Sequence, residues 1–116
     1  MNSFRYSLPF VAITAWALST LVAQAAELPK GSASAGAGKN SMCIGCHGID
    51  GYRTAFPTVY TVPKIAGQSA IYIVNALNAY KKGDRNHPSM RGIAASLSEQ
   101  DMADLAAYYS TAPLAK

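Results

Sequence analysis

The sequence predicts an all-α domain, and three observations support this fold class. Residues 69–83 and 97–110 each carry apolar side chains at the three- and four-residue spacing of an amphipathic helix. Turn-forming residues crowd the segment 48–68, so a long loop should separate the helices from an N-terminal part. The stretch FPTVYTV at 56–62 could pass for a strand, but no partner strand is evident and we do not expect a sheet.

The first 25 residues have the pattern of an export signal. Arg5 precedes an apolar run from Leu8 to Ala23, and the run ends in AQA at 23–25, which fits cleavage after Ala25. The alternative is an uncleaved membrane anchor, but polar residues dilute the run. We therefore expect a cleaved signal peptide at 1–25, a periplasmic protein, and no stable membrane insertion after cleavage.

Charge and length narrow the possible functions. The formal net charge is +4 over 116 residues, which suits electrostatic steering toward acidic partners. The charges are too few and too scattered to indicate nucleic-acid binding. A chain of this size is one domain at most and buries only a thin core, so we expect something else to fill its centre.

The N-terminal part of the mature chain is expected to be loosely ordered and then helical. Residues 26–34 predict a flexible lead-in, and 34–45 predict a short helix that Gly36 and Gly38 weaken. Gly38 is also expected to let this helix approach the C-terminal one closely.

The helix at 69–83 is the clearest in the chain. Ser69 is its candidate N-cap, and Gly83 ends it. The positive charges of Lys81 and Lys82 in the last turn interact favourably with the negative end of the helix dipole. A polar loop follows at 84–90.

The last part of the chain predicts a turn or two of helix after residue 90 and then the C-terminal helix. Ser98 and Asp101 have the spacing of a capping box, and Pro113 marks the helix end. Three or four helices are expected in total.

The motif Cys43-Ile-Gly-Cys46-His47 holds the only two cysteines in the chain, and three chemistries could use it. A thioredoxin-type dithiol normally follows a strand, which this sequence does not predict. A tetrahedral zinc site would need the distant His87 as its fourth ligand. A bare disulfide would leave His47 unused, whereas C-x-x-C-H is the signature of covalent haem attachment.

The spacing suits haem attachment. Residues three apart lie on one face of a helical turn, so both thiols can bond the two vinyl groups of one haem. His47, the next residue, is then directed at the iron. Together with an export signal and helical remainder, this motif predicts haem c bound through Cys43 and Cys46.

Several blocks of sequence resemble the small soluble bacterial class I c-type cytochromes with a single haem. They are CIGCHGIDG at 43–51, PKIAGQ at 63–68, YKKGDR at 80–85, Met90, and LSEQDMADLAAYYS at 97–110. The resemblance implies three to four short helices and a long loop wrapped around one covalent haem. It places the cytochrome c domain at 35–112 and leaves 113–116 as a C-terminal tail.

The resemblance also implies the second iron ligand. Class I members use a methionine from the loop before the last helix, and Met90 is the methionine in that position. His87 is the rival ligand, which would make the iron bis-histidine.

Further site residues follow from the same likeness. The carbonyl of Pro63 is expected to accept the second ring proton of His47, or Pro63 merely turns the loop. Arg85 is expected to pair with a haem propionate, although a solvated surface arginine is the alternative. Apolar candidates for the haem pocket are Ile65, Tyr72, Ile73, Leu77, Ile93 and Leu97.

If a histidine and a methionine fill both free coordination positions of the iron, no substrate can bind there and the iron can only exchange an electron. We therefore expect a one-electron carrier, not an enzyme, that takes electrons from a quinol-oxidising complex or dehydrogenase. It would deliver them to an oxidase or reductase through transient contacts. The alternatives are the haem subunit of a larger oxidoreductase complex, or a haem with a labile sixth site that binds small ligands.

Overall fold

The computed structural model describes residues 29–56 and 59–113. The predicted signal peptide at 1–25, the start of the lead-in and the end of the tail lie outside the described residues. The elements in chain order are α1 (Ala33–Lys39), α2 (Ser41–His47), β1 (Arg53–Thr54), β2 (Tyr60–Thr61), α3 (Ala70–Lys82), α4 (Pro88–Ala95) and α5 (Glu99–Thr111). The all-α class is confirmed, with five described helices where three or four were predicted. In the described part of the chain, the helices are too short or too polar to cross a membrane.

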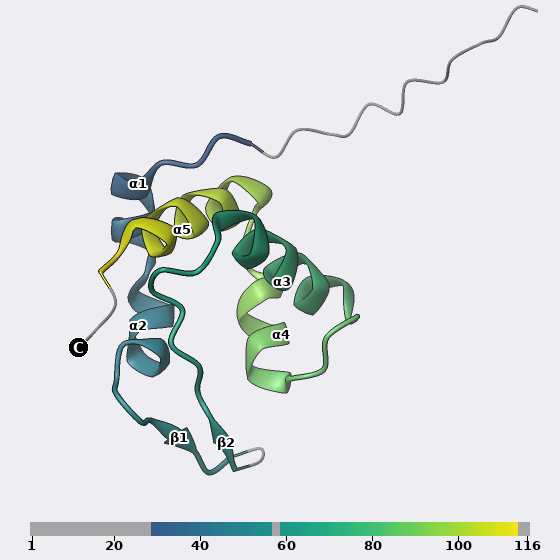
Figure 1. Ribbon diagram of the computed structural model, residues 1–116. Helices are drawn as coiled ribbons and strands as arrows, with labels where there is room; N and C mark the ends of the chain where they lie inside the picture. Colours follow the sequence, from purple (N-terminus) through teal and green to yellow (C-terminus); the bar gives the residue numbers. More distant parts are fainter. Residues whose placement is uncertain (1–28, 57–58, 114–116) are drawn as a thin grey trace, which may run out of the picture.

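The single helix predicted at 34–45 is wrong, because the structure has two helices there. Asn40 ends α1 and begins α2, and its carbonyl accepts hydrogen bonds from the amides of Cys43 and Ile44 at 2.8 and 2.9 Å. The break lets α2 leave the axis of α1, as Figure 1 shows. The C-x-x-C-H motif therefore occupies a short helix of its own.

The prediction of no strand is also wrong. β1 and β2 form a small antiparallel pair, with Arg53 opposite Thr61 and Thr54 opposite Tyr60. The amide of Val62 extends the ladder by donating to the carbonyl of Tyr52 at 2.9 Å. The partner lies immediately upstream in the chain, and two residues per strand are too few to show an alternating pattern in the sequence.

The ends of α5 and α3 follow the predicted capping chemistry in part. Ser98 and Asp101 form the capping box, with Ser98 Oγ accepting from the Asp101 amide at 3.1 Å and the Ser98 amide donating to Asp101 Oδ2 at 3.0 Å. Ser69 precedes α3, but its side chain makes no capping bond. Gly83 ends α3 with a φ of 92°, which glycine adopts without a steric penalty.

The core is built around α5, against which α1 and α3 pack, while α4 packs on α3 (Figure 1). Met102 is fully buried, and Leu105 nearly so. They share one cluster with five other buried side chains, Ile73, Val74, Leu97, Ala106 and Tyr109. A core of so few large side chains is thin, as the chain length predicted.

The close approach between α1 and α5 occurs at Gly36, so the assignment of this role to Gly38 was wrong. A Cβ at Gly36 would overlap the carbonyl oxygen of Asp104 and the Cβ of Tyr108, whereas one at Gly38 would meet nothing. The two glycines lie half a helical turn apart, so only one of them faces α5.

A charged cluster joins the same two helices. Lys39 Nζ lies 2.7 Å from Asp101 Oδ1 and 2.7 Å from Asp104 Oδ2. Asp104, 3% exposed, also accepts from the Ser32 amide at 2.8 Å and from Gln100 Nε2 at 2.9 Å. Its carboxylate is thus saturated with donors, and hydrogen bonding from Lys39 is the main cause that lowers the pKa of Asp104 to about 2.

Replacing Gly36 by alanine should destabilise the protein by about 1–3 kcal/mol, because the methyl group collides with a backbone carbonyl that cannot move aside. Gly38→Ala is the matched control. It fills open space in the same helix and should leave stability unchanged or raise it by up to about 1 kcal/mol. Urea unfolding of both variants measures the difference. Equal midpoints for the two would contradict the packing described here.

The charged cluster should make stability depend on pH in a defined direction. Between about pH 4 and pH 2 the unfolded chain takes up a proton at residue 104 that the folded chain does not, so stability falls as the pH falls. Asp104→Asn should therefore be less stable than the wild type near pH 6, and the difference should shrink toward pH 2.

Urea unfolding at several pH values measures this effect, with Glu99→Gln on the same helix as the control. A stability difference between wild type and Asp104→Asn that is constant across the pH range would show that the charge of Asp104 does not contribute.

Candidate functional site

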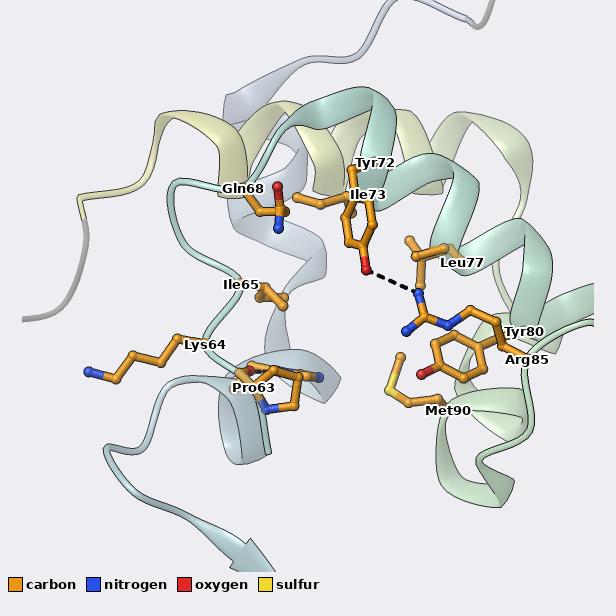
Figure 2. A pocket seen from close by; sticks show the side chains of 12 residues that line it. Pro63, Lys64, Ile65, Gln68, Tyr72, Ile73, Leu77, Tyr80, Arg85 and Met90 are labelled. Carbon is orange, nitrogen blue, oxygen red and sulfur yellow. Dashed lines mark hydrogen bonds between the residues drawn. The ribbon is translucent and has the colours of Figure 1, made fainter. Parts of the chain in front are cut away.

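A cleft of about 160 Å³ opens between the loop after β2 and the helices α3 and α4. Figure 2 shows the loop residues on one side of it and the side chains of α3, α4 and their connection on the other. Its lining is mainly apolar and consists of His47, Pro63, Lys64, Ile65, Gln68, Tyr72, Ile73, Ala76, Leu77, Tyr80, Arg85 and Met90.

His47 is the last residue of α2 and is held by the loop opposite. Its Nδ1 lies 2.6 Å from the carbonyl oxygen of Pro63. A carbonyl can only accept, so Nδ1 carries the proton and donates it. The second ring nitrogen, Nε2, is then left with its lone pair free to bind a metal.

Met90 is the third residue of α4 and brings a thioether to the same cleft. Pro88 opens this helix at its first position, where the missing amide costs nothing. The amide of Arg91 donates to the carbonyl of His87 at 2.9 Å and fixes the first turn that carries Met90. A soft sulfur and an imidazole nitrogen thus border one cavity.

The wall opposite the loop carries an arginine between two tyrosines. Arg85 Nη1 donates to the Tyr72 hydroxyl at a long distance of 3.4 Å, and its guanidinium lies 4.8 Å from the centre of the Tyr80 ring. The contact with Tyr72 is the main cause that raises the pKa of Arg85 above its usual value. A permanent positive charge is therefore held at the edge of a mostly apolar cleft (Figure 2).

Cys43 and Cys46 are half-buried free thiols, one helical turn apart on α2. Neither is among the residues that line the cleft, although His47 directly after them does. Cys43 packs against the buried core cluster. Burial raises the pKa of its thiol, and the nearby Tyr109 hydroxyl acts in the opposite direction.

The structure brings most of the predicted site residues to one cavity. These are His47, Pro63, Ile65, Tyr72, Ile73, Leu77, Arg85 and Met90. Ile93 is half-buried one turn beyond Met90 and does not line this cleft, so its contact with a haem stays a prediction. Leu97 belongs to the core cluster instead.

His87, the predicted rival of Met90, lines an adjoining pocket together with Met90, Tyr60 and Val62. Its ring packs edge-on against Tyr60, with ring centres 5.2 Å apart, and its Nδ1 is buried without a hydrogen-bond partner in the described chain. Within residues 29–56 and 59–113, no group of three histidine, cysteine or acidic side chains gathers to hold a metal ion. A zinc site of the kind considered above would need such a group.

Four lining residues were not among the expected pocket residues: Lys64, Gln68, Ala76 and Tyr80. Tyr80 and Ala76 could have been found, because they continue the helical face of α3 that carries Tyr72, Ile73 and Leu77. Gln68 had no such signal, since it lies in the loop before α3.

These residues fit a covalently bound haem. The helix α2 offers two thiols and an imidazole whose Nε2 is free, and the cleft adds a methionine sulfur and apolar walls. Ile65, Ile73 and Leu77 both line the cleft and belong to or touch the core cluster, so a ring seated there would complete the core.

The comparisons with known proteins agree with this donor set. Residues 33–112 match the family model described as cytochrome c. Cytochrome c-554(548) of Halomonas halodenitrificans is 43% identical over 84 residues, which cover 70% of this chain and 96% of that protein.

Two longer relatives are matched over half of their length or less. Cytochrome c4 of Pseudomonas aeruginosa is 40% identical over 81 residues, 70% of this chain and 38% of that protein. A protein of Stutzerimonas stutzeri named thiosulfate dehydrogenase electron acceptor is 35% identical over 114 residues, 97% of this chain and 50% of that protein. With the matched domain, these relatives show that the chain belongs to the cytochrome c family, whose members carry electrons on covalently bound haem c.

Proposed function

We propose that the protein is a periplasmic one-electron carrier with a single haem c, attached through Cys43 and Cys46 and ligated by His47 and Met90. The observation that supports this most directly is the pairing of His47 Nδ1 with the Pro63 carbonyl at 2.6 Å in a cleft that Met90 also lines. The chain has one C-x-x-C-H motif and no further cysteine, which supports one haem.

The Pro63 carbonyl has a defined chemical task in this proposal. By accepting a hydrogen bond from Nδ1–H, it fixes the tautomer in which Nε2 is the metal ligand, and it fixes the plane of the ring. A strong hydrogen bond at Nδ1 also makes Nε2 a better electron donor. The loop thus controls both the direction and the strength of the first ligand.

Met90 and the cleft walls act on the balance between the two oxidation states. When bound, the haem supplies a reversible exchange between ferrous and ferric iron. A thioether ligand and an apolar surrounding both favour the less charged ferrous state and raise the reduction potential. If His47 and Met90 both bound the iron, no coordination position would remain for a substrate, and this supports transfer of an electron alone.

Arg85 is placed to balance the charge of the haem carboxylates. Its guanidinium lies at the edge of the cleft, held by Tyr72 and Tyr80. We propose that it pairs with a propionate, because an arginine beside an apolar cavity binds carboxylate through charge-assisted hydrogen bonds.

Transient redox partners fit a carrier of this size. The partners we propose are a quinol-oxidising complex or dehydrogenase as donor and an oxidase or reductase as acceptor. The relative of Stutzerimonas stutzeri whose name describes an electron acceptor supports the carrier role. The same relative also favours the second candidate, a haem subunit that serves one oxidoreductase, because its name ties it to a single dehydrogenase.

Removing both thiols tests the attachment. The native protein, made in cells able to mature c-type cytochromes, should have the mass of the polypeptide plus one haem. The double variant Cys43→Ala, Cys46→Ala should carry no haem and should be unfolded or degraded, because haem binding and folding are linked and the core is thin. Mass spectrometry and circular dichroism measure these two properties.

Ser41→Ala in the same helix is the control and should retain the haem. A native protein without added mass would contradict the proposal. A haem-free double variant that folds well would contradict the dependence of the fold on haem.

Comparing Met90→Ala with His87→Ala identifies the sixth ligand. Met90→Ala should keep the covalent haem, lower the reduction potential, and bind carbon monoxide rapidly in the reduced state because a coordination position opens. His87→Ala should leave the absorption spectrum and the potential close to those of the native protein. The reverse outcome would assign the ligand to His87.

A further inference from the structure

Tyr109 carries a buried hydroxyl for which the proposed function gives no role. Its side chain belongs to the core cluster and is only 6% exposed. Within the described part of the chain, no group accepts or donates a well-formed hydrogen bond at this hydroxyl. Buried hydroxyls nearly always form a hydrogen bond. An unpaired one indicates that its partner is absent, or that a nearby partner is not yet oriented to form the bond.

The position of Tyr109 is fixed from two directions. Its own carbonyl accepts from the amide of Gly67 at 2.8 Å, which ties α5 to the loop that borders the cleft. Its ring packs at 75° against Tyr108, with ring centres 5.0 Å apart. The side chain therefore has little freedom to turn its hydroxyl toward solvent.

The Cys43 sulfur is a polar group close to this hydroxyl. Cys43 packs against the core cluster to which Tyr109 belongs. The two groups interact electrostatically, and after burial, proximity to Cys43 is the next cause of the raised pKa of Tyr109. The hydroxyl thus lies beside one of the two proposed attachment sites.

We propose that the Tyr109 hydroxyl donates a hydrogen bond to the Cys43 sulfur in the haem-bound protein and acts there as a positioning residue. This inference rests on the proposed attachment of haem through Cys43. A thioether sulfur has lone pairs but no proton, so only the hydroxyl can donate. The bond would give the buried hydroxyl its partner and fix the rotamer of Cys43.

The same bond should influence the cofactor. A donor at the sulfur withdraws electron density from the linkage to the ring, which favours the reduced state, as hydrogen bonds around a metal centre commonly do. Tyr109 would therefore tune the reduction potential from the core side, away from the two iron ligands.

Tyr109→Phe in the haem-loaded protein tests the inference, because it removes the hydroxyl and keeps the ring. Resonance Raman spectra should show a shift in one carbon–sulfur stretching band, and the other thioether band should stay in place. Single-attachment variants Cys43→Ala and Cys46→Ala assign the two bands. The reduction potential should fall, and the urea midpoint should fall by about 0.3 M or more.

Tyr108→Phe is the matched control, since it removes the neighbouring hydroxyl from the same helix and should change none of these values. Unchanged carbon–sulfur bands, or a urea midpoint that rises in Tyr109→Phe, would overturn the inference, because removing a truly unpaired buried hydroxyl stabilises a protein. Mass spectrometry separates this result from failure of the proposed function. A haem-free wild type would contradict the attachment itself, whereas haem-bound variants without a band shift contradict only the role of Tyr109.

Discussion

The hydrogen bond between His47 Nδ1 and the Pro63 carbonyl, 2.6 Å long, joins the two parts of the chain on which the site depends. It links the end of α2 to the start of the loop that forms one wall of the cleft. Four residues further on, the Gly67 amide donates to the Tyr109 carbonyl on α5 at 2.8 Å. The backbone of the loop is thus held at both ends, and between them the Ile65 side chain packs against the core cluster.

Helix α5 is the element against which both α1 and α3 pack. Helix α1 approaches α5 closely at Gly36, and salt bridges from Lys39 to Asp101 and Asp104 join the two helices. Its buried side chains meet those of α3, whose other residues form the wall of the cleft. Core and cleft therefore share side chains, and a cofactor in the cleft would serve as part of the core. This sharing explains how so short a chain can hold a fixed site.

The arrangement suits an electron carrier better than a catalyst. Imidazole and thioether border one apolar cavity, and the charge at its edge, Arg85, is cationic and held by two tyrosines. The chain covers nearly all of one cytochrome c relative but half or less of the longer ones. Residues 33–112 thus correspond to one cytochrome c domain.

The sequence by itself predicted the all-α class, the capping box of Ser98 and Asp101, and the C-x-x-C-H motif at 43–47, whereas Met90 became a candidate ligand through the resemblance to class I cytochromes. The fold class, the capping box and the motif follow from local spacing, which depends only on neighbours along the chain. Tertiary structure decided the break at Asn40, the pairing of β1 with β2, the choice of Gly36 over Gly38, and the exclusion of Ile93 from the cleft. Each of these depends on which face of an element meets a distant segment, and a single sequence does not record those contacts.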